Sequence, residues 1–240
     1  MTAPANEAAD PPSGDVLPTG RDKERAVRAM FDRIAPRYDV LNRILTFGMD
    51  TGWRRRAVEA LALAPFSLVL DVASGTGDFC RELARAGLRP VGMDVSWGML
   101  VAGRHRSPLV QADALRLPVR AGAADGITCG FALRNVVELS GLFREFARAL
   151  RPGGRVSILE VSEPSSAVVR AGHGVYFRRV VPMIGAVLSD RPAYQYLPKS
   201  TAYLPPLPKV LSMLAGAGFT GVQSRPLALG AVRITTATRR

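Results

Sequence analysis

Residues 68–78 predict a strand, a glycine loop and a helix in direct succession. Their sequence is L-V-L-D-V-A-S-G-T-G-D, in which a short apolar run reaches an acid, Asp71, before a loop of small residues. This order is typical of the nucleoside-binding unit of doubly wound α/β folds. Gly75 and Gly77 allow the backbone to turn sharply and a ligand to approach it closely. The chain is therefore expected to be an α/β protein with a mostly parallel sheet.

Two kinds of cofactor fit a loop of this type, a dinucleotide and S-adenosylmethionine (SAM). The dinucleotide pattern G-x-G-x-x-G needs a third glycine where the helix packs on the strand, and Cys80 stands at that position. A carboxylate at the strand end, Asp71, repels a pyrophosphate but suits the ammonium group of SAM. The loop thus looks like motif I of the class I SAM-dependent methyltransferases. A glycine turn that serves only the topology is the alternative.

Two further apolar segments of the chain also end at acids. Residues 90–95 contain Asp94, about twenty residues beyond the glycine loop, and residues 109–112 lead to Asp113. An acid in the first position can accept both ribose hydroxyls, and one in the second can accept the adenine amino group. Three successive strands that end in acids match the methyltransferase pattern better than the dehydrogenase pattern.

The remaining periodicity completes an alternating α/β pattern. A helical N-terminal extension begins at Asp22 and forms either a lid or a packing helix. Residues 1–21 are expected to be a disordered tail and residues 22–240 one methyltransferase domain. The expected fold is the class I Rossmann-like sheet of seven strands with helices on both faces and a helical insertion, residues 165–200, after the fifth strand. The other expected strands are residues 125–131, 155–160, 221–229 and 230–238, and the other helices are 97–106, 139–150 and 207–217.

Composition narrows the function. No run of 18 apolar residues exists, so no transmembrane helix is expected, and the start of the chain does not resemble a signal sequence. Two distant cysteines, Cys80 and Cys129, show no metal-site spacing and suit a reducing cytoplasm. A formal net charge of +12 favours contact with anionic lipid, although a solvated basic surface explains it equally well. A nucleic-acid methyltransferase is disfavoured because the N/D-P-P-Y/F motif is missing.

With these motifs assembled, the chain resembles the ubiquinone/menaquinone biosynthesis C-methyltransferase family from about residue 27 to residue 221. Motif I is shared by many methyltransferases, whereas the other marks are distinctive. They are F-D-R-I-A-P-R-Y-D-V-L-N (residues 31–42), F-A-L-R-N-V (131–136) and A-Y-Q-Y-L-x-x-S (193–200). The family's F-G-L-R-N reads F-A-L-R-N here, with an alanine in place of the glycine. The segment after Ser200 and the C-terminal strand also diverge from the family pattern.

The resemblance implies SAM contacts at Thr76, Asp94, Asp113 and Ala114. A further family contact, usually a serine, falls on Gly130, where only the backbone remains to make it. No metal is expected. Together with the motif I residues, the predicted cofactor site is Asp71, Gly75, Thr76, Gly77, Asp94, Asp113, Ala114 and Gly130.

The resemblance also implies methyl transfer to a ring carbon of a prenylated quinol, most simply demethylmenaquinol to menaquinol. Arg134, beside Asn135, would hold the developing phenolate, and Tyr38 or water would relay the proton. A surface salt bridge for Arg134 and lid packing for Tyr38 and Asn42 are the structural alternatives. The ring system and the length of the prenyl tail stay open.

Other functions and partners also stay open. The chain could methylate another aromatic or lipidic small molecule, or bind SAM without activity. Its expected location is the cytoplasm, in peripheral contact with the inner face of the membrane through residues 165–203, because a prenyl tail partitions into lipid. A homodimer is the other expected partner, and nucleic acid is not expected.

Overall fold

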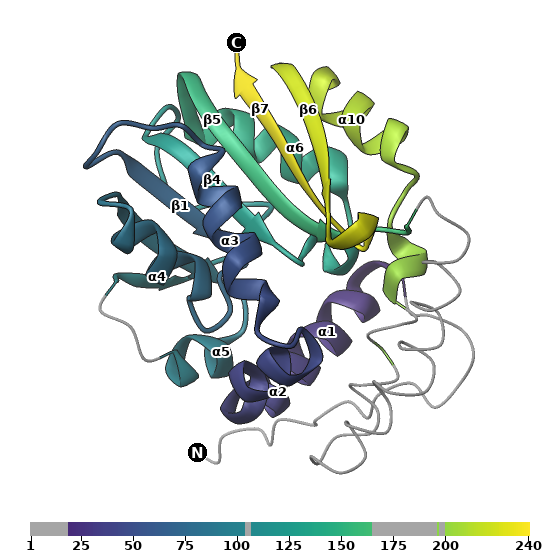
Figure 1. Cartoon of the computed structure of the whole chain (residues 1–240). Helices are drawn as coiled ribbons and strands as arrows, with labels where there is room; N and C mark the ends of the chain where they lie inside the picture. The colour runs from purple at the N-terminus through teal and green to yellow at the C-terminus, as the bar shows by residue number, and fades with distance from the viewer. Residues whose placement is uncertain (1–18, 104–106, 165–195, 197–199) are drawn as a thin grey trace, which may run out of the picture.

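A seven-stranded sheet forms the centre of the protein in a computed structural model that describes residues 19–103, 107–164, 196 and 200–240 (Figure 1). The strand order is β3-β2-β1-β4-β5-β7-β6. Strands β1 to β5 are parallel, and β7 runs antiparallel to both of its neighbours. This confirms the expected class I methyltransferase sheet with its C-terminal hairpin. The strands are β1 Leu68–Val72, β2 Arg89–Asp94, β3 Leu109–Gln111, β4 Ala124–Gly130, β5 Leu150–Val161, β6 Phe219–Leu227 and β7 Val232–Arg239.

Helices cover both faces of the sheet, as expected (Figure 1). The neighbours Val69 and Leu70 point to opposite faces, and both are buried because each face has its own apolar core. Val69 packs with residues of α3 and α4, whereas Leu70 packs with residues of α6 and α10. The helices of the domain are α3 Met49–Glu59, α4 Asp78–Arg85, α5 Trp97–Ala102, α6 Leu139–Ala149 and α10 Leu207–Gly216, with the short 3₁₀ turns η2 Leu133–Asn135, η4 Thr201–Tyr203 and η5 Ala228–Gly230.

The N-terminal extension is helical, as predicted, and consists of α1 Gly20–Ile34, η1 Ala35–Arg37 and α2 Tyr38–Leu45. Its apolar residues, spaced as expected for one helix face, form a small core around Met30, Ile34 and Leu41. In Figure 1 these helices lie at the end of the molecule opposite the C-terminus. The extension thus closes one end of the sheet.

Some boundaries differ from the prediction. Strand β1 continues through Asp71 to Val72, so this acid lies within the strand. The fifth strand, expected over residues 155–160, begins earlier and is β5, Leu150–Val161. Helix α1 begins at Gly20, within the predicted tail. Apart from Tyr196 and Ser200, the predicted insertion lies outside the described residues, as does most of the tail. Across the described residues, no helix is long and apolar enough to cross a membrane.

Candidate active site

A cavity lies where the carboxyl ends of the parallel strands meet the N-terminal helices. Helix α1 contributes Glu24, Val27 and Phe31 to its wall, and α2 contributes Tyr38. The extension therefore forms the lid that was one of its two predicted roles. The sheet side of the wall consists of Ala73, Gly75, Asp94, Val95, Met99, Ala112, Asp113, Ala114, Leu115, Gly130, Phe131, Ala132, Asn135, Val136 and Val137.

Of the predicted site residues, the structure brings seven to this wall. They come from five separate segments, which meet because the carboxyl ends of parallel strands share one edge of the sheet. The seven are Tyr38, Gly75, Asp94, Asp113, Ala114, Gly130 and Asn135, and the four that lie off the wall are Asp71, Thr76, Gly77 and Arg134.

Asp94 is fixed by the backbone on both sides. One carboxylate oxygen accepts a hydrogen bond from the Gly75 amide and the other accepts one from the Ser96 amide, both at 2.8 Å. Gly75 adopts φ +55°, a conformation that favours glycine. Burial raises the pKa of Asp94. Each oxygen keeps a second lone pair, so the carboxylate can still accept the two hydroxyls of a ribose.

Asp113 is placed by the turn after β3. Its carboxylate accepts a hydrogen bond of 2.8 Å from the Leu115 amide, and Ala114 and Leu115 themselves line the cavity. Close by on the wall are the apolar side chains of Val95, Met99 and Ala112. One polar group at the edge of an apolar surface suits a flat heterocycle with an amino group.

Asp71 does not face the cavity, which corrects the expectation that it meets the ammonium group of a ligand. Because β1 runs on to Val72, the Asp71 side chain lies in the interior, where Thr128 Oγ1 donates to it at 2.9 Å and Cys80 Sγ at 3.5 Å. Burial raises the pKa of Asp71 to about 7. Asp71 therefore supports the strand next to the loop and makes no contact with the cavity.

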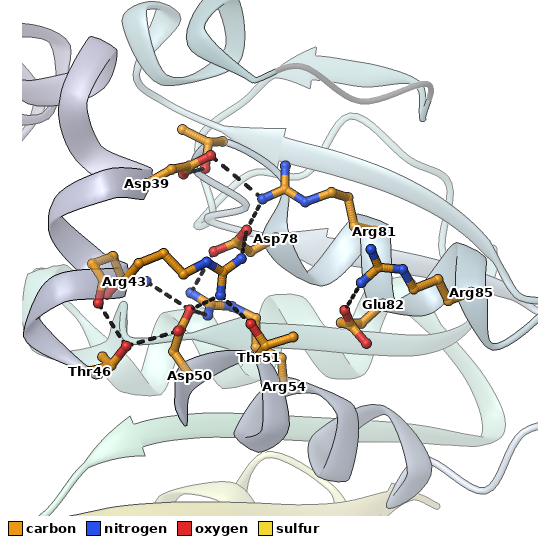
Figure 2. A network of polar contacts seen from close by, with 12 residues as sticks. Asp39, Arg43, Thr46, Asp50, Thr51, Arg54, Asp78, Arg81, Glu82 and Arg85 are labelled. Atoms are coloured by element: carbon orange, nitrogen blue, oxygen red, sulfur yellow. Dashed lines mark hydrogen bonds and ion pairs between the residues drawn. The ribbon is translucent and has the colours of Figure 1, made fainter. Parts of the chain in front are cut away.

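Thr76 and Gly77 belong to the motif I loop but do not line the cavity. The hydroxyl of Thr76 donates to Asp39, and Gly77 adopts φ +84° where α4 begins. Figure 2 shows that this region belongs to a larger polar network in which Asp78 meets Arg43 and Arg81. The buried Arg54 pairs with both Asp50 and Asp78. Helices α2, α3 and α4 are thereby joined directly behind the glycine loop.

Asn42 belongs to this network and not to the cavity. Its amide donates to Asp50 at 3.2 Å. This agrees with the packing role that was the structural alternative for Asn42. Its place in the distinctive F-D-R-I-A-P-R-Y-D-V-L-N motif thus reflects the attachment of α2 to α3.

The aromatic ring of Phe79 occupies the space that a side chain at residue 130 would need. A Cβ atom at residue 130 would lie 2.6 Å from the nearest carbon of that ring, well inside a normal contact. Phe79 is itself buried against the α3 side of the sheet. The next residue, Phe131, lines the cavity in a left-handed conformation, φ +56°. Where the resemblance predicted a serine contact, the wall therefore consists of the Gly130 backbone and the Phe131 side of the cavity.

Arg134 is buried behind the wall with a carboxylate partner. Its Nη1 donates to Glu160 at 2.5 Å, and the same carboxylate accepts from the amides of Leu133 and Val161. Its Nε has no hydrogen-bond partner among the described residues. The charge of Arg134 is thus largely neutralised before any ligand binds, by a salt bridge that is buried and not on the surface as the structural alternative had it.

Asn135 and Tyr38 form the polar part of the wall at this end. The Tyr196 hydroxyl donates a hydrogen bond to the side-chain oxygen Oδ1 of Asn135 at 3.2 Å. The ring of Tyr38 meets Phe31 edge-on, with centroids 6.0 Å apart. Burial raises the pKa of Tyr38 and raises that of Tyr196 beyond its usual range. Both phenols therefore stay protonated at neutral pH and can donate hydrogen bonds.

Two charged residues of α1 were missed by sequence reasoning. Asp32 accepts from the Ser96 hydroxyl at 2.6 Å and from the Gly98 amide at 2.8 Å, which attaches the lid to α5. Lys23 donates to the Val136 carbonyl at 3.0 Å. Asp32 lies within the distinctive motif of residues 31–42, which was a usable signal. Lys23 lies outside these motifs, and its only sequence feature is that it stands four residues, about one helical turn, before the apolar Val27.

Comparison with known proteins agrees with this geometry. The model of the ubiE/COQ5 methyltransferase family matches residues 19–239. The chain is 41% identical over 235 residues to a demethylmenaquinone methyltransferase of Roseiflexus castenholzii, covering 94% of this chain and 98% of the relative. It is 41% identical over 221 residues to the ubiquinone/menaquinone biosynthesis C-methyltransferase UbiE of Syntrophotalea carbinolica, covering 88% and 93%.

Solved structures show the same fold at low sequence identity. A SAM-dependent methyltransferase of Thermotoga maritima, described as a possible histamine N-methyltransferase, aligns with a TM-score of 0.63 and 16% identity over 89% of this chain and 99% of that chain. Phosphoethanolamine N-methyltransferase 2 of Haemonchus contortus, in complex with SAM, aligns with a TM-score of 0.54 and 16% identity, covering 76% and 52%. With the family model matched over nearly the whole chain and relatives this similar, the chain belongs to the ubiE/COQ5 methyltransferase family.

Proposed function

We propose that the protein methylates a ring carbon of a prenylated quinol, with demethylmenaquinol as the acceptor and menaquinol as the product. The names of the relatives from Roseiflexus castenholzii and Syntrophotalea carbinolica support a quinol acceptor. The observation that carries the proposal is Asp94, held on the cavity wall by the Gly75 and Ser96 amides. It is an acceptor for a diol, in a cavity whose opposite wall is formed by α1 and α2.

The residues of the cavity fit SAM. Asp94 would accept the ribose hydroxyls, Asp113 would accept the adenine amino group, and Val95, Met99 and Ala112 would pack on the adenine ring. Gly75 leaves space for the close approach of the rest of the molecule, because it has no side chain. When bound, SAM supplies an electrophilic methyl group, which needs no metal ion.

The acceptor would lie toward Tyr38 and Asn135, because these are the polar side chains at the other end of the wall. The Tyr38 hydroxyl donates a hydrogen bond to a ring oxygen in this arrangement, and the Asn135 amide orients the ring. Arg134 acts from behind the wall, where its pairing with Glu160 fixes the turn that carries Asn135. Positioning of this kind accelerates a reaction by holding the ring carbon in line with the transferred group.

The test is methyl transfer in vitro together with quinone profiling in cells. Purified protein with SAM and a reduced, short-tailed demethylnaphthoquinol should give the C-methylated product, and the matching benzoquinol should react more slowly. A strain that lacks this chain should accumulate the demethyl species. Normal quinones in that strain, combined with no transfer to either quinol in vitro, would contradict the proposal.

We also propose peripheral contact with the membrane, since a prenyl tail partitions into lipid. Val40 on α2 and Phe47 in the turn after α2 are 59% and 74% exposed, and on α5, Trp97 and Val101 are 59% and 65% exposed. The inner sides of the same two helices reach the cavity through Tyr38 and Met99. Together with the net charge of +12, these apolar side chains suit an anionic lipid surface.

Vesicle flotation tests this contact. The wild type should float with anionic vesicles at low salt and less so at high salt, and the double variant V40S/F47S should float poorly. A matched control is F66S, because Phe66 is 77% exposed but lies before β1, outside both helices. The residues first predicted to dock, 165–203, lie mostly outside the described part of the chain. A homodimer remains a prediction.

A further inference from the structure

Lys23 is buried on the side of α1 that faces the active site. The residue is 4% exposed, and its neighbours Glu24 and Val27 line the cavity. Its ammonium group donates to the Val136 carbonyl at 3.0 Å and lies 3.8 Å from the centroid of the Tyr203 ring. Val136 itself lines the cavity beside Asn135. Lys23 itself does not line the cavity, but its ammonium group lies directly behind Val136, next to the end of the wall that Asn135 forms.

This lysine is unlike the other buried cations. Among the described residues, Arg54 pairs with Asp50 and Asp78, and Arg134 pairs with Glu160, whereas Lys23 has no carboxylate within 4.0 Å. Two of its three N–H donors lack an oxygen partner in the same part of the structure. A cavity beside a partly unsatisfied ammonium group is a place where an anion can bind.

The position is also unfavourable for a cation. Lys23 lies in the first turn of α1, where the helix dipole disfavours positive charge. Burial penalises an ammonium group further and lowers the pKa of Lys23 to about 8. A methionine would fill the same space without either penalty. The hydrogen bond to Val136 and the contact with the Tyr203 ring offset only part of these penalties. A bound anion would therefore account better for a cation at this position.

We propose that Lys23 is a catalytic residue that binds the oxygen anion of the acceptor ring during methyl transfer. This rests on the proposed function. Arg134 was expected to do this from the sequence, but its charge is paired with Glu160, whereas Lys23 has no such partner among the described residues. Lys23 has the charge and the spare donors, and its ammonium group lies next to the cavity wall, behind Val136.

The chemistry balances without a further reactant. The quinol hydroxyl loses its proton to water, and the resulting anion is held by the ammonium group. The ring carbon forms a bond to the methyl carbon while the methyl–sulfur bond breaks, and the sulfur keeps that electron pair. The same ring carbon then loses its hydrogen as a proton to water, the ring regains its aromaticity, and the oxygen takes up a proton. One proton is released per methyl group transferred.

The pH dependence would identify this role. The Tyr203 ring on η4 contacts Lys23 directly, and α1 itself carries Asp22 and Glu24. Arg134 lies on η2, which packs on α1 and η4, and Tyr196 lies near both Tyr203 and Arg134. An ammonium group beside the ring lowers the pKa at which the bound quinol ionises. In the wild type the rate should therefore rise at lower pH than in Lys23→Met. The difference between the two should shrink in alkaline solution, where the quinol ionises unaided and Lys23 is itself neutral.

The experiment is single-turnover methyl transfer to a reduced, short-tailed demethylnaphthoquinol across this pH range. We expect Lys23→Met to lower the rate constant about 10²-fold at pH 7, the scale of one lost oxyanion donor, with little change in SAM affinity by calorimetry. Lys23→Arg should recover part of the rate. Lys209→Met is the matched control, because Lys209 is exposed on α10, outside the cavity, and it should behave as the wild type.

Each outcome decides the question. Lys23→Met should melt at the same temperature as the wild type or above it, since the penalty of the buried charge is removed. A clear fall in melting temperature would show that the ammonium group is structural and would overturn the proposal. So would a folded Lys23→Met protein with the wild-type rate and pH profile. A wild-type protein that methylates no quinol would instead refute the proposed function.

Discussion

At the scale of single residues, Asp94 is the group on which cofactor binding depends most. It joins two loops, because Gly75 and Ser96 both donate to it, and it faces the cavity. In Asp94→Asn the amide nitrogen must oppose one of these backbone donors. We expect SAM affinity to fall by on the order of 2 kcal/mol or more, measured by calorimetry. Asp22→Ala is the control, because Asp22 is exposed and pairs only locally with Arg25.

The same carboxylate gives SAM binding a pH dependence. Burial raises the pKa of Asp94, so the carboxylate takes up a proton at higher pH than an exposed aspartate would. Affinity for SAM should therefore weaken on acidification before exposed carboxylates begin to titrate. Affinity that stays constant down to the ordinary pKa of aspartate would show that Asp94 does not accept the ribose hydroxyls.

Arg134 and Glu160 form a buried pair, which changes what a substitution at Arg134 would do. Arg134→Ala leaves the Glu160 carboxylate with only its two backbone donors, Leu133 and Val161. Loss of one partner of a buried pair destabilises by about 3–5 kcal/mol, so the variant should melt early as well as react slowly. The double variant R134M/E160Q should recover much of the stability in thermal melting. If it recovered the full rate too, Arg134 would have no part in the reaction.

At the scale of elements, the attachment of the lid depends on Asp32. Its carboxylate accepts from Ser96 and Gly98, at the N-terminus of α5, where anionic groups stabilise a helix. Asp32→Ala should destabilise the fold by about 1 kcal/mol in denaturant unfolding. Hydrogen exchange should become faster in α1 and α5 but not in α6, which lies on the other face of the sheet. Uniform acceleration would mean that the lid does not open separately.

At the scale of the whole molecule, Asp71 couples stability to pH. Its pKa is raised to about 7, above the unfolded value of about 3.9, so its contribution to stability is complete below pH 4 and is lost as the pH rises through 7. Asp71→Asn should remove this dependence and be the more stable protein at pH 8, by on the order of 2–4 kcal/mol. Melting temperatures of both proteins at pH 5 and pH 8, without ligand, provide the test. Equal curves would show that Asp71 ionises normally.

The sequence predicted those parts of the molecule that follow from regular geometry. Parallel strands that end in acids must bring them to one edge, so Asp94 and Asp113 were placed correctly on the cavity wall. The position of Asp71 was predicted wrongly because the exact last residue of a strand cannot be determined from the sequence. A shift of one or two residues decides to which side a side chain points. The partners of Arg134 and Lys23 come from distant segments, so local pattern could not reveal them.

The contact between Gly130 and Phe79 also couples two positions that lie far apart in the sequence. A Cβ atom at residue 130 would lie 2.6 Å from the Phe79 ring, so a side chain at residue 130 requires that ring to move. The effect of a substitution at one of these positions thus depends on the residue at the other, as is general for residues in direct contact. A side chain at residue 130 that adds a cofactor contact is therefore expected to go together with a changed residue 79, and not to arise alone.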